Sequence, residues 1–239
     1  MSSNVEIARI RAAYAQWEGT LDKSNPGYQM AVRQRDRALS RLLEKHFPID
    51  LRDCRILDIG CGVGGLLGWF HERGACAAHL FGLDLLPHRI AAARRTYPSF
   101  TFIEGNAEQL DFADAWFDII TVLTVFSSIL DDDVAENVAA AIRRVLKPDG
   151  VVVWYDIRYP SPNRNVRPFT RRRVAALFPG YRLRLIPITL LPPVYRHLGR
   201  MTERIYPWLV SVPVLRSHYI GLLHPPASQP RFACAETDP

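Results

Sequence analysis

Short apolar runs alternate with amphipathic stretches through the middle of the chain. Runs without a polar face are typical of buried strands. They cover residues 54–60, 79–86, 100–106, 117–126 and 151–159. Apolar positions at helical spacing predict intervening helices over residues 64–73, 87–96 and 131–146. Because these helices separate successive strands, the pattern predicts a doubly wound open sheet.

The two ends of the chain depart from this rhythm. Helical spacing predicts helices over 4–17 and 29–46, ahead of the first strand. The stretch KPDG, residues 147–150, is typical of a helix stop and a turn. After a polar loop, the chain is expected to form a short helix, a strand, proline-punctuated short helices and a last strand. These cover residues 171–180, 181–191, 192–213 and 216–224.

Together these elements predict an α/β fold with a Rossmann-like, doubly wound, seven-stranded sheet. The sheet is expected to be mostly parallel with an antiparallel last strand. N-terminal helices and a helical insertion near the C-terminus complete it. We expect residues 1–50 to form a helical cap and 51–225 one domain, with its insertion at about 190–215. Residues 226–239 are expected to be a flexible tail.

Composition indicates the cellular location of the protein and whether it binds a metal. Charged residues make up 23% of the 239 positions, and no apolar run approaches the roughly 20 residues that span a bilayer. The N-terminus lacks the apolar core of a signal peptide, so a cytoplasmic location is expected. The cysteines have no zinc spacing, and we expect free thiols and no metal. They are Cys54, Cys61, Cys76 and Cys234.

Positive charge is concentrated in one segment. Residues 155–210 contain eleven arginines, against Asp156 and Glu203 as the acids. Such asymmetry favours an anionic substrate, a nucleic acid or an anionic membrane surface as the partner. A solvated basic face without a ligand is the alternative.

The glycine-rich turn is the strongest local motif. Gly60, Gly62 and Gly65 match G-x-G-x-x-G between a strand and a helix, a pattern shared by sites for NAD(P) and for S-adenosylmethionine. Either ligand would offer ribose hydroxyls to Asp84, which ends the second strand. Asp58 favours S-adenosylmethionine, because its carboxylate suits a methionine ammonium and repels a pyrophosphate.

Further motifs follow the turn in order. ILDIGCGVGGLL, GLDLLPHRIAAAR, FIEGNAEQLDFADAWFDIITV and RRVLKPDGVVVWYDIR resemble the successive motifs of class I S-adenosylmethionine-dependent methyltransferases. The resemblance spans about residues 55–158. Later stretches, TVFSSILDD and WYDIRYPSPNRNVR among them, are similar to a bacterial branch of small-molecule or polysaccharide biosynthesis.

The resemblance implies which residues bind the methyl donor. Around the methionine part it places Asp58, Gly60, Cys61, Gly62, Gly64 and Thr124. On the ribose and adenine it places Asp84, Leu85, Asn106 and Ala107. The family usually has Asp at the position of Asn106; Asn keeps an acceptor oxygen for the adenine amine. S-adenosylhomocysteine would be the product.

The acceptor is expected at the carboxyl ends of the strands, beside the loops after the fourth and fifth strands. Our catalytic candidates there are Asp156, Arg158 and Tyr159. Asp156 is a candidate base, and the alternative is a structural partner for an arginine. The substrate-site candidates are Tyr14, Trp17, Phe126, Asn163, Arg167 and His218. For His218 a structural role is the favoured alternative.

The expected reaction is an in-line methyl transfer to a small-molecule or glycan acceptor, more at oxygen than at nitrogen. That acceptor could be anionic or lipid-linked, and a homodimer is possible. An RNA methyltransferase is an alternative, disfavoured because no N-P-P-Y-like motif or RNA-binding module is present. A membrane-surface module with a methyltransferase core is another, suggested by the basic and apolar stretch 190–216.

Overall fold

The computed structural model describes residues 3–18, 22, 24–47 and 50–226. A seven-stranded sheet with the order β3-β2-β1-β4-β5-β7-β6 forms its centre. The strands are β1 (Ile56–Ile59), β2 (Leu80–Asp84), β3 (Thr101–Glu104), β4 (Phe117–Leu123), β5 (Leu146–Ile157), β6 (Arg182–Leu190) and β7 (Arg216–His224). β7 runs antiparallel to both β5 and β6, whereas β1 to β5 pair in parallel. The predicted fold class is therefore confirmed.

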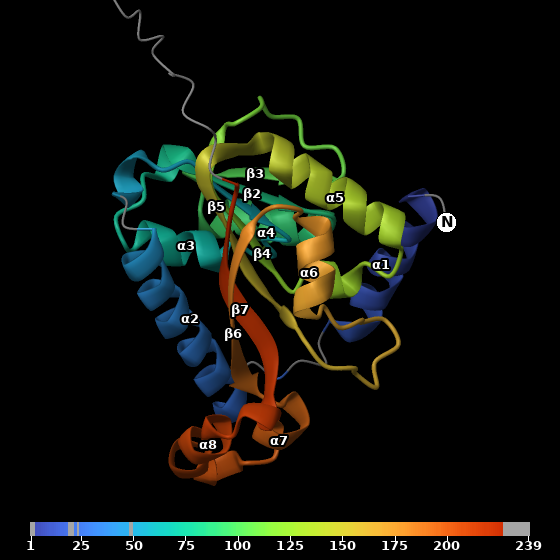
Figure 1. Ribbon diagram of the computed structural model, residues 1–239. Helices are drawn as coiled ribbons and strands as arrows, with labels where there is room; N and C mark the ends of the chain where they lie inside the picture. The colour runs from blue at the N-terminus through green and yellow to red at the C-terminus, as the bar shows by residue number, and fades with distance from the viewer. Residues whose placement is uncertain (1–2, 19–21, 23, 48–49, 227–239) are drawn as a thin grey trace, which may run out of the picture.

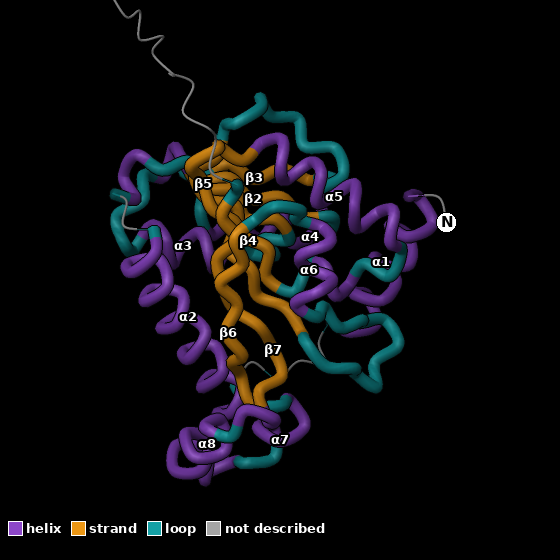
Figure 2. Tube along the Cα trace, viewed as in Figure 1, coloured by secondary structure: helices purple, strands orange, loops and turns teal. Residues whose placement is uncertain are grey.

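Helices cover both faces of the sheet (Figures 1 and 2). On one face, α5 (Asp132–Val145) and α6 (Arg171–Leu177) share a buried cluster with Leu57, Ile120 and Trp154. On the other, α2 (Pro26–His46), α3 (Gly65–His71) and α4 (Pro87–Thr96) pack around Ile56 and Ile119. Adjacent residues of one strand thus face opposite layers, as the doubly wound prediction requires.

The predicted turn at KPDG is wrong in one respect, because the structure includes these residues in β5. Phe117 of β4 pairs with Leu146, and Ile119 pairs with Val151, so residues 147–150 form an irregular bulge within the strand. Lys147 Nζ contacts Asp118 Oδ1 at 2.6 Å across this bulge. The strand thus continues through Pro148 and Gly150, and Gly150 lies close to the Asp118 backbone, where a Cβ would be 2.9 Å from the carbonyl oxygen.

The ends of the chain build walls beyond the sheet. α1 (Ser3–Trp17) lies across the carboxyl ends of the central strands, on the side of α5. α7 (Pro192–Arg196) and α8 (Thr202–Ser211) lie at the far end of β6 and β7, beside the start of α2 (Figure 1). Leu190, Tyr195 and Tyr206 form a small core there with Ala31.

Within the described residues, no helix is long and apolar enough to cross a membrane. Over the same residues, no cluster of histidine, cysteine and carboxylate side chains could hold a metal ion. Cys54, Cys61 and Cys76 are free thiols. Cys234 and the predicted tail beyond residue 226 lie outside the described residues.

Candidate functional site

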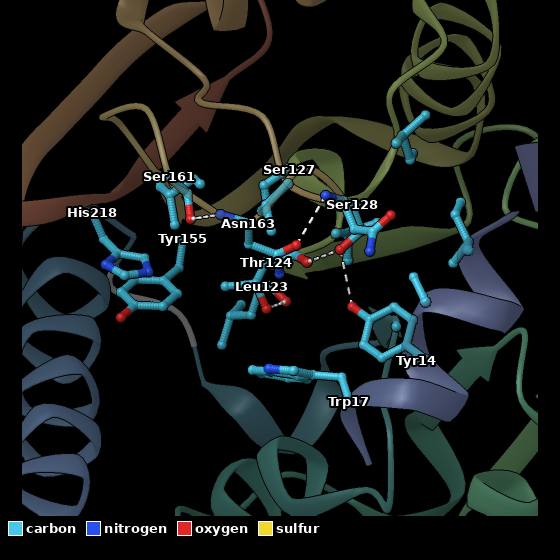
Figure 3. Close-up of a pocket in the computed structure, with 18 of the residues that line it drawn as sticks. Tyr14, Trp17, Leu123, Thr124, Ser127, Ser128, Tyr155, Ser161, Asn163 and His218 are labelled. Carbon is cyan, nitrogen blue, oxygen red and sulfur yellow. Dashed lines mark hydrogen bonds between the residues drawn. The ribbon is translucent and has the colours of Figure 1, made fainter. Parts of the chain in front are cut away.

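A cavity of about 1060 Å³ opens at the carboxyl ends of β1, β2, β4 and β5. α1 and α2 form two of its walls, and the loop of residues 159–166 and the segment 191–196 close it further. The close-up in Figure 3 shows residues from α1, β4, β5, β7 and the 159–166 loop facing this space. In doubly wound sheets this edge is where ligands bind.

The backbone conformation of the glycine turn favours glycine at only some of its positions. Gly60, Gly62 and Gly64 have positive φ angles of 72°, 55° and 82°, a region that glycine enters without steric cost. A Cβ on Gly60 would also lie 2.9 Å from the Val125 side chain. Gly65 begins α3 and has open space where a Cβ would be. Gly60, Gly62 and Gly64 are therefore the positions whose backbone conformation favours glycine. Gly60, Cys61 and Gly65 line the cavity, whereas Gly62 and Gly64 do not.

Two buried carboxylates flank the turn and both line the cavity. Asp84 accepts hydrogen bonds from the backbone amides of Gly62 and Leu86, each at 2.9 Å. Asp58 accepts one from the Thr121 hydroxyl at 2.5 Å. Burial, with a smaller contribution from the charge of Asp84, raises the pKa of Asp58 to about 7. Asp84 therefore fixes the turn and keeps further lone pairs for a ligand.

The next part of the wall combines two apolar residues with one amide. Leu85, Asn106 and Ala107 all line the cavity. Asn106 accepts from the backbone amide of Glu108 at 3.1 Å and donates to the Glu108 carboxylate at 2.9 Å. These bonds orient the Asn106 amide. The three residues predicted beside the adenine therefore line one cavity.

Thr124 occupies a strained position at the end of β4. Its φ of 57° is costly for a β-branched residue. Its backbone amide donates to the Tyr155 carbonyl at 2.6 Å. The Ser128 hydroxyl lies 3.3 Å from the Thr124 carbonyl and 3.0 Å from the Tyr14 hydroxyl (Figure 3). Such strain tends to persist at functional sites, and here it links the strand end to α1.

A buried glutamate anchors α1 over the cavity. Glu6 is fully buried, and its carboxylate accepts from the backbone amides of Leu130 and Asp131 and from Arg9. Burial alone would raise the pKa of Glu6, but the hydrogen bonds from Arg9 and Leu130 outweigh it and lower the pKa. The anchored helix brings Tyr14 and Trp17 to the cavity wall.

The structure does not bring Asp156 or Phe126 into the cavity lining. The Asp156 carboxylate accepts from the backbone amides of Ser127 at 2.9 Å and Ile157 at 2.8 Å. Burial raises its pKa to about 6. The Phe126 ring is fully buried and stacks on Trp154 with the ring centroids 4.9 Å apart. Both residues hold the loop after β4 in place from behind.

The two arginine candidates are also turned away from the lining. Arg158 lies over the rings of Tyr159 and Tyr219, at 4.3 and 5.0 Å from their centroids. Arg167 donates to the Leu130 carbonyl at 2.9 Å and to the Asp132 carboxylate at 2.7 Å. These side chains brace the loop after β5. Among the other candidates, Tyr159, Asn163 and His218 do line the cavity.

Several residues that line the cavity were not predicted from the sequence. Thr189, Ser217 and Arg35 come from β6, β7 and α2. No motif signals Thr189 or Ser217, because the two meet only through the antiparallel pairing of β6 with β7. Ser128 could have been predicted from its position, because it follows Thr124 in the loop expected beside the acceptor.

A family model described as "Methyltransferase domain" matches residues 56–150. A ubiquinone biosynthesis O-methyltransferase of Cereibacter sphaeroides is 28% identical over 180 residues, which is 72% of this chain and 68% of that protein. A demethylmenaquinone methyltransferase of Chlorobaculum parvum is 35% identical over 99 residues, 41% of this chain and 39% of that protein. Beyond the ubiquinone enzymes, the chain spans half or less of the length of the curated relatives it matches.

Solved structures show the same fold. A 1,6-didemethyltoxoflavin N1-methyltransferase of Burkholderia thailandensis, with bound 1,6-didemethyltoxoflavin and S-adenosylhomocysteine, superposes with a TM-score of 0.66. Its sequence identity is 17%, and the match covers 95% of this chain and 91% of that protein. At this identity the comparison establishes the architecture and leaves the acceptor open.

Proposed function

Because this chain belongs to the class I S-adenosylmethionine-dependent methyltransferases, we propose that it transfers a methyl group from S-adenosylmethionine to a hydroxyl of a small molecule. One observation carries the proposal. A single cavity joins the glycine turn and its two carboxylates to a second, aromatic wall. Donor and acceptor can therefore share one enclosed space, as a direct in-line transfer requires.

The residues present fit the donor. Asp84 retains lone pairs for two ribose hydroxyls while its other contacts hold the turn. The positive φ angles at Gly60, Gly62 and Gly64 set the backbone of the turn. Gly60 lines the cavity without a side chain, which leaves room for the methionine part of the donor. Asp58 suits the donor's ammonium, and Asn106 offers an oxygen to the adenine amine. When bound, the donor supplies an electrophilic methyl group on a sulfonium.

The protein's own contribution is to orient and enclose the reactants. Tyr14 and Trp17 of α1 cover the cavity on one side, and Tyr155 and His218 lie on another (Figure 3). This enclosure excludes water and holds a flat acceptor near the strand ends. The name of the Cereibacter relative supports oxygen as the acceptor atom, and a glycan remains within the same chemistry.

Donor binding tests the proposal most directly. We expect Asp84→Ala to weaken S-adenosylhomocysteine binding at least about tenfold in calorimetry, because a charge-assisted pair of hydrogen bonds is lost. Asp149→Ala, an exposed carboxylate of the β5 bulge, is the matched control. Unchanged affinity in Asp84→Ala would contradict the assignment.

Acceptor class is tested with labelled donor. Intact protein is incubated with methyl-labelled S-adenosylmethionine and a bacterial extract, which is then divided into small-molecule, RNA and lipid fractions. We expect label in the small-molecule fraction. Label confined to RNA would favour the nucleic-acid alternative, and its loss at moderate salt would agree with phosphate contacts.

A further inference from the structure

His218 of β7 lies in a part of the cavity wall that contains none of the residues proposed to bind the methyl donor. It is 7% exposed, and its imidazole stacks on the Tyr155 ring with centroids 4.7 Å apart and planes 5° apart. Figure 3 shows this stacked pair across the cavity from Trp17 and Tyr14, with Thr124 and Leu123 between them. The imidazole thus lies in the wall of the space proposed for the acceptor.

A chain of hydrogen bonds fixes the protonation of this imidazole. The Ser217 hydroxyl lies 3.1 Å from the Thr189 carbonyl and 2.7 Å from Nδ1 of His218. We assign the single proton of the serine hydroxyl to the backbone carbonyls of Thr189 and Leu190, at 3.1 and 3.5 Å, because a carbonyl can only accept. In this assignment Nδ1 carries the hydrogen that it donates to Ser217. Nε2 is left with an open lone pair, and no described residue bonds to it.

The chain of hydrogen bonds depends on a strained residue. Thr189 has a φ of 63° and interrupts the regular pairing between Ile188–His218 and Leu190–Arg216. Its hydroxyl bonds to the Tyr155 hydroxyl at 2.9 Å, while its carbonyl receives Ser217. One costly backbone conformation therefore positions both members of the stacked pair, and strain of this kind is retained where structure serves a site.

Burial and a nearby cation keep the imidazole neutral. Burial, followed by the cation of Arg35, lowers the pKa of His218 to about 4. Arg35 comes from α2, lies 5.9 Å from the Tyr155 ring centroid and pairs with Asp36 at 2.8 Å. The groups facing His218 are therefore Arg35 from α2, Tyr155 from β5 and Ser217 beside it. At neutral pH, Nε2 is available as a proton acceptor.

We propose that Nε2 of His218 accepts the proton of the acceptor hydroxyl during methyl transfer, with Ser217 and Thr189 as positioning residues. The assignment rests on the proposed function and narrows its substrate class to a hydroxyl on an aromatic ring. Trp17, Tyr14 and Tyr155 line the same cavity, and aromatic walls favour flat aromatic ligands.

The step balances in atoms and charge. An oxygen lone pair forms the new O–C bond, the C–S bond breaks, and its electrons pass to sulfur. The hydroxyl proton moves to Nε2, so the positive charge passes from the sulfonium to the imidazole. A protonated ether is far more acidic than an imidazolium, so even a weak base can take this proton. The low pKa of His218 then favours release of the proton to solvent.

Nitrogen NMR of histidine-labelled protein tests the tautomer without turnover. The resonances absent from His218→Gln assign those of His218. We expect a neutral ring, protonated at Nδ1, from pH 6 to pH 8, and a mixture of tautomers in Ser217→Ala. Adding catechol to the complex with S-adenosylhomocysteine should shift the Nε2 resonance. An Nε2-protonated or charged ring, or an Nε2 signal unmoved by catechol, would overturn the inference.

Kinetics with catechol as the hydroxyl probe supply the second readout. At saturating donor, His218→Gln should lower kcat by about 10²- to 10⁴-fold, the usual effect of losing a general base. Added imidazole should restore part of the rate in His218→Ala. His71→Gln, at the exposed end of α3, serves as the control. A rate in His218→Gln within threefold of wild type would reject the role.

Donor affinity separates this inference from the proposed function. We expect His218→Gln to bind S-adenosylhomocysteine as tightly as the wild type. If wild type fails to bind S-adenosylhomocysteine, the proposed function itself fails. If binding is intact and the His218 tautomer is reversed, the methyltransferase assignment stands and His218 has a structural role.

Discussion

A buried carboxylate beside the position proposed for the donor ammonium should make donor binding sensitive to pH. Asp58 has a pKa of about 7 in the free protein, chiefly because it is buried. A donor ammonium beside it would favour the charged form and lower that pKa. Binding below about pH 7 must therefore release protons, and donor affinity should rise as the pH increases from 6 to 8.

Calorimetry at pH 6 in two buffers of different ionisation enthalpy measures this release. We expect a fraction of a proton per donor bound to wild type, and none attributable to this site in Asp58→Asn. The Asn variant keeps an acceptor for the Thr121 hydroxyl, so it is a conservative change. Equal proton release by both proteins would remove Asp58 from the ammonium site.

At the scale of single residues, most of the predicted donor residues line the cavity, whereas Asp156, Arg158, Phe126 and Arg167 on the acceptor side do not. Gly60, Asp58 and Asp84 are neighbours along a strand–turn–helix motif or at equivalent strand ends, so spacing locates them. Asp156 ends a strand too, but its side chain points to backbone amides behind the cavity. Adjacent side chains of a strand point to opposite faces, but the sequence does not indicate which face meets the ligand. It therefore could not predict whether Asp156 or Tyr155 faces the cavity.

At the scale of elements, α1 depends on one buried charge. We expect Glu6→Gln to destabilise the docking of α1 by about 2 kcal/mol, because hydrogen bonds to a charged group become neutral ones. The lowered pKa of Glu6 means that this stabilisation is present above about pH 4.5 and is lost as the pH falls below it. Limited proteolysis within α1 should accelerate in the variant at pH 7.

Glu44→Gln, an exposed position on α2, is the control for this change. Because α1 carries Tyr14 and Trp17, the Glu6 variant should also bind S-adenosylhomocysteine more weakly. Proteolysis and binding unchanged from wild type would show that Glu6 does not anchor the helix.

The accuracy of the predicted elements follows from local signals. α4 begins at Pro87, and Pro at an early helical position marks a start that needs no tertiary information. The bounds of β7 were also predicted. The β5 bulge was not predicted, because KPDG is a strong turn sequence. The contact of these residues within the sheet is made with Asp118, which is distant in sequence. The contact between Ser217 and Thr189 was unpredictable for the same reason.

At the scale of the whole molecule, the cavity couples donor binding to global stability. Its walls come from α1, α2, the ends of six strands and the segment 191–196, so a ligand that fills it holds elements from both layers together. A ligand that binds the folded state at a concentration of about 100 Kd stabilises it by about 2.7 kcal/mol.

For a domain of this size each kcal/mol raises Tm by about 2–4 °C. We therefore expect saturating S-adenosylhomocysteine to raise the Tm by about 5–10 °C in thermal unfolding, and NADH to leave it unchanged. Asp84→Ala should lose most of the shift, whereas Asp149→Ala should keep it. A shift of equal size with NADH would return the glycine turn to the dinucleotide-binding class, because Asp58 would then fail to exclude a pyrophosphate.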